Sequence, residues 1–297
     1  MKKRCKVTPE NVAKWIKNGD GQGEGNNYKP FIKVRDVPSK GRSSMVRGIK
    51  TDRTHHYLSD LEYACHILAE FCLKIIDIRE QFALLPSDDT QKIARRLGFK
   101  HPVYPGTKTP IVMTSDLVLT IRQGKTKKFL VLCVKHSSAL RQDQEPESKR
   151  YKRTCQKLLI EKIYWKSRKV PWLIITDKTI PWTKVYNLDL LRPSLMLKHE
   201  EGLNGLLPLF VLLFYKYWEE KRILNDVLDR IAFELKKDRP YCFHLFARSV
   251  WSSILPVDLN LSKIHHFSPV PLIQQPYPEL DPFNSSPSME LDHDFNK

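Results

Sequence analysis

The chain has 297 residues, a formal net charge of +17 and six cysteines that show neither a C-x-x-C pair nor zinc-ligand spacing. Its most apolar run, from Leu206 to Tyr215, is about ten residues long, whereas a membrane-spanning helix needs roughly 20. These features argue against a disulfide-stapled secreted domain and a membrane protein, and the basic excess indicates a polyanionic partner, with nucleic acid as the first candidate. The polar sequence after Met-Lys-Lys-Arg predicts no secretion signal and a cytoplasmic location.

The first expected element is a short helix that Thr8 caps and that has Pro9 at its first position. Gly19 ends it and opens a run, up to Gly25, in which glycine alternates with other residues. Such a run can cradle a phosphate, but no strand precedes it, so a flexible turn is the favoured interpretation.

Helical and strand patterns then alternate along the chain. The expected helices cover residues 59–74, 88–97 and 146–169, and the expected strands cover residues 75–85, 111–121, 129–135 and 170–177. A basic turn with one glycine joins the second and third strands and makes them a hairpin. The order predicts a mixed α/β core.

The last third of the chain has a different composition. Residues 203–237 are apolar and helical in pattern, and the aromatic-rich stretch over 241–254 is consistent with a further helix or a pair of strands. From Pro256 onward, prolines punctuate a polar sequence, which predicts disorder. We therefore expect one domain over residues 1–180, a second over 181–255 and a disordered tail over 256–297.

Three residues in these elements form a candidate site. Glu62 lies at the edge of the first helix of the α/β core, Asp116 lies in one arm of the hairpin, and Lys135 ends the other arm. A lysine that ends an apolar strand needs a partner, and Asp116 is placed to be one. Taken alone, such a pair is more often structural than catalytic.

The same residues also suit metal-dependent hydrolysis of a phosphodiester. Two carboxylates can hold Mg²⁺ or Mn²⁺, and a nearby lysine can orient or help deprotonate a water molecule. An acid, a long gap, a strand acid and a strand-end lysine is the order of the PD-(D/E)xK nuclease core. His55 and His56 are not expected to share a metal, because neighbours on a strand point to opposite faces.

Longer stretches of the sequence resemble the TnsA family, the endonuclease subunits of heteromeric bacterial transposases that also use TnsB and TnsC. The matching words run in order from about Thr8 to Asp177: Gly21-Gln-Gly23-x-Gly25, Val37-Pro-Ser-x-Gly41-Arg-Ser, His55-His56-x-Leu-Ser-Asp60-Leu-Glu62, Asp77-Ile-Arg-Glu80-Gln-Phe-x-Leu-Leu-Pro86-Ser-Asp, Lys100-His-Pro-Val103, Thr114-Ser-Asp116, Val134-Lys135, Glu161-x-x-Tyr-Trp165 and Pro171-Trp172-x-Ile-x-Thr-Asp177. Many words in sequence carry more weight than any one of them.

The resemblance implies a restriction-endonuclease-like mixed sheet flanked by helices and, by position alone, a small, mainly helical winged-helix-like C-terminal domain. It implies that Glu62, Asp116 and Lys135 are catalytic, and that Glu62, Asp116 and the main-chain carbonyl of Val134 bind Mg²⁺ or Mn²⁺, with two ions expected. Glu161 matches a nearby acid of less defined role. The implied partners are transposon-end DNA, the TnsB transposase and the TnsC ATPase, in the bacterial cytoplasm and at the nucleoid when assembled. The subunit would cut the 5′ ends of the transposon while TnsB cuts and joins the 3′ ends.

One position departs from the family. Where TnsA proteins usually have glutamine, two residues before the lysine, this chain has Cys133. Strand alternation places Cys133 on the face that carries Lys135, so its side chain is expected to point toward the ion. A thiol is a poor ligand for Mg²⁺, so this residue either packs as a small apolar side chain while the other ligands keep the ion, or weakens the site or shifts it toward a softer ion such as Mn²⁺. Two functions therefore stay open: an active 5′ endonuclease, and a DNA-binding or bridging subunit with an impaired site that positions TnsB and TnsC.

Overall fold

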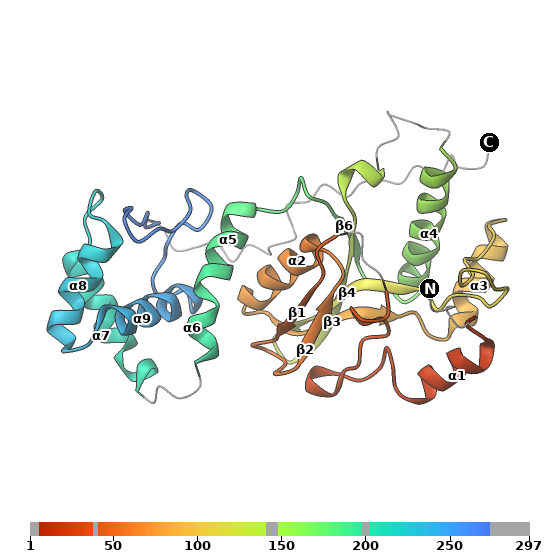
Figure 1. Cartoon of the computed structure of the whole chain (residues 1–297), viewed down its shortest axis with the longest axis horizontal. Coiled ribbons are helices and arrows are strands. Elements are labelled where there is room, and N and C mark those ends of the chain that lie inside the picture. Colours follow the sequence, from red (N-terminus) through yellow and green to blue (C-terminus); the bar gives the residue numbers. More distant parts are fainter. Residues whose placement is uncertain (1–5, 38–40, 141–147, 198–201, 274–297) are drawn as a thin grey trace, which may run out of the picture. The chain divides into compact units, whose positions relative to one another are not determined.

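The computed structural model describes residues 6–37, 41–140, 148–197 and 202–273, and the chain divides into two compact units between Ile180 and Pro181 (Figure 1). Each unit has its own buried core. In the part of the chain that the structure describes, no helix is both long enough and apolar enough to cross a membrane.

A four-stranded mixed sheet forms the centre of the first unit. Its strands, in spatial order, are β3 (Ile75–Ala83), β4 (Thr114–Gln123), β5 (Thr126–Val134) and β6 (Trp172–Ile175). The first three are antiparallel neighbours, whereas β6 runs parallel to β5. Gly124 turns the β4–β5 hairpin with a φ of +59°, a conformation that glycine adopts at little cost. The mixed sheet predicted from the sequence is confirmed.

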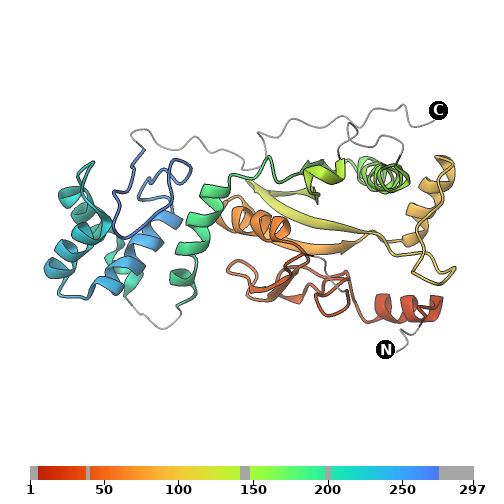
Figure 2. The same cartoon turned by 45° about the horizontal axis from the view of Figure 1, so that its top comes forward.

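Helices cover both faces of this sheet. The helices α3 (Ser87–Arg96) and α4 (Lys149–Lys166) pack on the face that carries Val118 and Val131. Side chains alternate along a strand, so the fully buried leucines of β4 and β5 lie on the opposite face, where α2 (Asp60–Phe71) contacts β3 and β4 (Figure 2). A short 3-10 turn, η2 (Ser137–Leu140), follows β5.

The N-terminal segment packs beside β3. It contains α1 (Pro9–Lys17), the 3-10 turn η1 (Gly25–Asn27) and the antiparallel hairpin of β1 (Ser44–Arg47) and β2 (Thr54–Tyr57). Thr8 caps α1 as predicted, with its side chain accepting from the Asn11 amide. The glycine-rich run is a structural turn, because the Gly21 amide donates to the Lys29 carbonyl and the Gly25 amide donates to Asp77. These amides are therefore engaged within the protein rather than presented to a phosphate.

The second unit is mainly helical, as expected. Its helices are α5 (Trp182–Leu191), α6 (Pro193–Met196), α7 (Leu203–Tyr217), α8 (Leu224–Leu235) and α9 (Arg239–Trp251), so the aromatic-rich stretch is a helix and not a pair of strands. Isolated antiparallel bridges join Ile223 to Pro269 and Val257 to Leu272. The order along the chain is α7, the bridge at Ile223, α8, α9 and the bridge at Val257. This order is compatible with a winged-helix-like domain, which stays a prediction.

The expectation of disorder from Pro256 onward is wrong for residues 256–273. Val257, Leu259, Ile264 and Val270 are buried. The buried side chain of Asn187 on α5 holds this segment, donating to the carbonyls of Leu259 and Ser262 at 2.9 and 2.8 Å and accepting from the Ile264 amide at 2.7 Å. Prolines prevent regular helix or strand here, but the apolar residues between them still pack. Residues 274–297 of the predicted tail lie outside the described residues.

Candidate active site

Asp116 and Lys135 meet where β4 begins and β5 ends. The Lys135 ammonium donates to Asp116 Oδ2 at 2.7 Å and to the Val134 carbonyl at 2.9 Å, and the Val134 amide donates to the same Oδ2, also at 2.7 Å. The side chains of Lys135 and Asp116 are 31% and 16% exposed, so this ion pair is accessible from solvent. The ion pair predicted from the sequence is thus present, and it joins the two arms of the hairpin.

Glu62 lies in the first turn of α2. Ser59 caps this helix by accepting from the Glu62 amide. The Glu62 carboxylate in turn accepts from Ser59 Oγ at 3.1 Å and from the Leu58 amide at 3.0 Å. It is buried, whereas the helical pattern placed it at the edge of the apolar stripe. The cap therefore fixes both the start of the helix and the direction of the carboxylate.

Electrostatics connect Glu62 to the ion pair. Burial, followed by the charge of Asp116, raises the pKa of Glu62 to about 7. Burial and Asp116 likewise raise the pKa of Glu161 on α4 to about 7. For Lys135, burial lowers the pKa, but the charge of Asp116 outweighs it, so the net pKa lies well above its ordinary value. The charge of Asp116 thus acts on both other carboxyl groups and on the Lys135 ammonium, and a further cation would stabilise the charged forms of the carboxyl groups.

Glu161 and Cys133 lie on the α4 side of the sheet. Ser115 Oγ donates to Glu161 Oε1 at 2.7 Å, and Trp165 Nε1 donates to Ser115 Oγ at 2.8 Å. Cys133 is fully buried with Leu140 and Leu158. Burial and the neighbouring Glu161 raise the pKa of its thiol well above its ordinary value. Its packing among these apolar side chains makes Cys133 a core residue beside Glu161.

Gln81 is a member of this site that sequence reasoning did not single out. Its amide nitrogen donates to Glu62 Oε2 at 3.2 Å, and its amide oxygen accepts from Thr114 Oγ1 at 3.3 Å. It lies inside one of the family words, after Glu80, but the strand pattern assigned it no chemistry. The only available signal was a buried-strand position occupied by an amide side chain.

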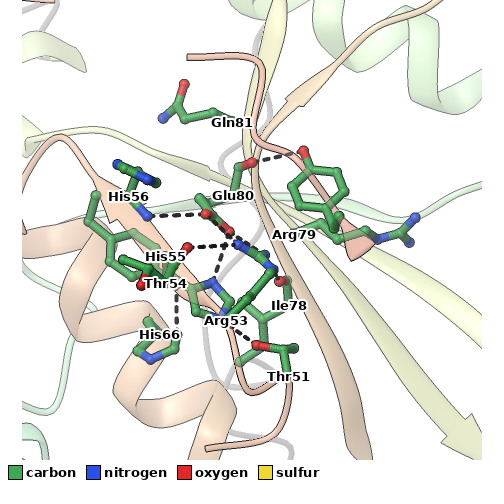
Figure 3. Close-up of polar contacts among 12 residues, drawn as sticks. Thr51, Arg53, Thr54, His55, His56, His66, Ile78, Arg79, Glu80 and Gln81 are labelled. Carbon is green, nitrogen blue, oxygen red and sulfur yellow. Dashed lines mark hydrogen bonds and ion pairs between the residues drawn. The ribbon is translucent and has the colours of Figure 1, made fainter. Parts of the chain in front are cut away.

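A buried polar network anchors the preceding residue, Glu80, to the β1–β2 hairpin (Figure 3). Both terminal nitrogens of Arg53 donate to the Glu80 carboxylate, at 2.8 and 2.6 Å, and His55 Nδ1 and the His56 amide lie within hydrogen-bonding distance of it, at 2.9 and 3.1 Å. His55 Nε2 contacts Thr51, and His56 Nδ1 accepts from the Val34 amide. The adjacent histidines thus have different surroundings, as the alternation of side chains along a strand predicts.

The donor atoms at the site suit a hard divalent cation. Glu62, Asp116 and the Val134 carbonyl offer oxygen ligands only, and Mg²⁺ commonly binds through one or two carboxylates with water and substrate oxygens completing its shell. Within the described ranges, no group of three or more His, Cys, Asp or Glu side chains lies close enough to enclose a metal. The residues therefore fit an open Mg²⁺ or Mn²⁺ site but not a closed, all-protein one.

Comparisons with known proteins match this part of the chain. Residues 72–177 match the family described as "TnsA-like endonuclease N terminal". The stretch contains Gln81, Asp116, Lys135 and Glu161 and begins ten residues after Glu62. The chain is also 44% identical over 169 residues to the transposon Tn7 transposition protein TnsA of Escherichia coli. That similarity spans 57% of this chain and 57% of the relative, so the chain covers little more than half of the relative's length.

Proposed function

We propose, on the basis of the TnsA-like endonuclease domain formed by residues 72–177, that this protein is the DNA endonuclease subunit of a transposase. In this proposal it hydrolyses the 5′ ends of the transposon, and a TnsB-like partner cuts and joins the 3′ ends. The observation that supports it best is the Asp116–Lys135 pair, which lies where β4 begins and β5 ends and whose Asp116 charge acts on the buried carboxylate of Glu62.

Glu62, Asp116 and the Val134 carbonyl would hold Mg²⁺ or Mn²⁺. A bound divalent cation would act as a Lewis acid on the scissile phosphate and lower the pKa of a water molecule. Whether one or two ions bind stays a prediction. Asp116 would coordinate the cation and would also accept the hydrogen bond from Lys135. This shared contact would fix the position of the lysine relative to the phosphate.

Lys135 would act as a hydrogen-bond donor rather than as a base. Its net pKa is raised, so its side chain stays an ammonium at neutral pH and has no lone pair to accept a proton. An ammonium that is hydrogen-bonded to Asp116 can donate a hydrogen bond to the oxygen of the attacking water and so orient it. It can also stabilise the negative charge that develops on the phosphate. Replacement by arginine would keep the charge but not the compact amine.

The proposed DNA partner is supported by charge. The chain carries a net charge of +17, and the N-terminal turn of α4 exposes Lys149, Arg150 and Lys152. Lysine and arginine side chains bind phosphates without reading sequence. TnsB- and TnsC-like proteins are the further proposed partners, and the bacterial cytoplasm is the proposed location.

A bridging subunit with an impaired nuclease site is the second candidate function. The observation that favours it is Cys133, whose neutral, buried thiol leaves the position two residues before Lys135 without an oxygen donor. Such a subunit would bind transposon ends and position TnsB and TnsC without cutting DNA.

Strand-specific cleavage mapping separates the two candidates. Purified protein would be combined with its TnsB and TnsC partners, transposon-end DNA and either Mg²⁺ or Mn²⁺. The nuclease proposal expects 5′-strand cuts that disappear in Asp116→Ala and persist in Asp88→Ala, which changes an exposed acid on α3. Unaltered 5′ cleavage by Asp116→Ala would refute the site, and no 5′ cut by the parent protein in either metal would favour the bridging subunit.

A further inference from the structure

We propose that Gln81 is a positioning residue that sets the orientation of the Glu62 carboxylate at the cation site. This inference rests on the proposed function, because it assigns a task to Gln81 within that site. Three observations support it: the backbone conformation of Gln81 on β3, the hydrogen bonds at both ends of the Gln81 amide, and the hydrogen bonds that Glu62 accepts.

The backbone of Gln81 departs from the strand directly opposite Asp116. The antiparallel register pairs Glu80 with Leu117 and Phe82 with Ser115, so Gln81 and Asp116 face one another across β3 and β4. Gln81 has a φ of +47°, in the left-handed region that non-glycine residues rarely adopt. Strained backbone of this kind persists only where the surroundings fix it, and it gathers at functional sites.

The side chains of the neighbouring residues Glu80 and Gln81 point in different directions. The Glu80 side chain enters the Arg53–His55 network, and Figure 3 shows the Gln81 side chain pointing away from that network. The Gln81 carbonyl accepts from the Phe31 amide at 3.2 Å. Hydrogen bonds of the Glu80 side chain and of the Gln81 carbonyl thus hold the backbone around Gln81. The Gln81 side chain is directed toward Glu62.

Both ends of this amide are engaged. Gln81 is buried, its nitrogen donates to Glu62 Oε2, and its oxygen accepts from Thr114 Oγ1. Because a glutamine amide has a distinct donor end and acceptor end, the contact with Thr114 at the start of β4 fixes which end faces Glu62. The amide thus connects α2 to the strand that carries Asp116.

Glu62 accepts three hydrogen bonds from described residues: from the Leu58 amide and Gln81 on Oε2, and from Ser59 on Oε1. A carboxylate has about four acceptor positions, so Oε1 keeps a free one. Leu58 and Ser59 belong to the same local turn as Glu62, and Gln81 is the contact that comes from the sheet. We infer that Gln81 fixes the carboxylate relative to Asp116, while its neutral amide adds no positive charge that would compete with a cation.

A double-mutant cycle tests this role. Mn²⁺ binding would be measured by titration calorimetry on the full chain for the parent protein, Gln81→Met, Glu62→Ala and the double variant. Methionine has similar length but neither donor nor acceptor. Residues that orient a metal ligand commonly contribute roughly 10–100-fold to metal affinity, so we expect Gln81→Met to weaken Mn²⁺ binding by about tenfold. In the Glu62→Ala background the same change should have no effect, and Gln91→Met on α3 serves as the matched control.

The outcomes distinguish this inference from the proposed function. An equal loss of affinity in both backgrounds, or no loss in the parent background, would overturn the role of Gln81. If the parent protein binds no Mn²⁺, the proposed cation site fails, and a crystal structure of Gln81→Met then decides the positioning role. A displaced Glu62 carboxylate supports it, and an unchanged one refutes it. If Gln81→Met does not fold, Gln81→Gly takes its place, because glycine accepts the left-handed backbone.

Discussion

Replacing Glu80 by glutamine tests the buried network that holds the β1–β2 hairpin against β3. The Glu80 side chain is fully buried and forms an ion pair at 2.6 Å with Arg53, itself 8% exposed. Glutamine keeps the shape but leaves the Arg53 charge without a counter-charge. Breaking a buried pair in this way costs about 3–5 kcal/mol. In a domain of this size, each kcal/mol lowers Tm by roughly 2–4 °C, so we expect Tm to fall by roughly 6–20 °C.

The same variant should change the response of stability to acid. Burial raises the pKa of Glu80, but hydrogen bonds from Arg53 and His55 outweigh it, so the net pKa lies well below its ordinary value of 4.5. The unfolded chain therefore takes up a proton near pH 4.5 that the folded protein resists. The stabilisation is fully present above that pH and falls as the pH drops toward the folded-state pKa. The stability gap between the parent protein and Glu80→Gln should accordingly narrow below about pH 4.5.

Thermal and urea denaturation followed by circular dichroism between pH 3 and 8 would measure both effects. Asp52→Asn is the matched control, because the Arg47–Asp52 pair is also short, at 2.7 Å, but is 50% and 59% exposed. Exposed pairs contribute about 0.2–1 kcal/mol. If Glu80→Gln cost no more than this control, the network would not anchor the hairpin. A gap independent of pH would refute the assigned direction of the Glu80 pKa.

Four further substitutions have defined outcomes. Lys135→Met removes the ammonium, which would compete with a cation for Asp116 Oδ2 and the Val134 carbonyl. Mn²⁺ affinity in calorimetry should therefore rise about tenfold, and 5′ cleavage should be lost. Weaker Mn²⁺ binding would contradict this competition. Gly21→Ala should lower stability by about 1–3 kcal/mol, because a Cβ there would lie 2.4 Å from that of Ala83 at a φ of +76°. Gly19→Ala, at a φ of +82° with open space, should cost less in the same denaturation assay. Cys133→Ala should leave Mg²⁺ affinity unchanged, and a marked loss would show that the thiol is a ligand.

Local patterns predicted the parts of the site that depend on strand geometry. Alternating side chains, the glycine turn and the lysine at the end of an apolar strand were sufficient to pair Asp116 with Lys135. The helical spacing from residue 59 onward placed Glu62 near the start of a helix, and the structure adds the Ser59 cap. In each case the residues that determine the structure lie close together in the sequence or across one hairpin.

The remainder depends on contacts that no local pattern encodes. The left-handed backbone of Gln81 is imposed by partners on other elements, among them Thr114 and Phe31, and glutamine itself has no preference for that conformation. The burial of Cys133 beside Glu161 likewise required α4 to be placed on the sheet. In the segment over 256–273, prolines hid the periodicity of side chains that nevertheless pack.

The hydrogen bonds of Asn187 also affect how the second unit folds during synthesis. They join α5 to Leu259 and Ile264, which lie 72 and 77 residues further along the chain. At a synthesis rate of roughly 5–20 residues per second, these partners are made about 4–15 s after Asn187. Such distant contacts also form late because their loop-closure entropy must be overcome first. The buried amide of the first helix of the unit to be synthesised therefore has no hydrogen-bond partners until most of the unit has been made.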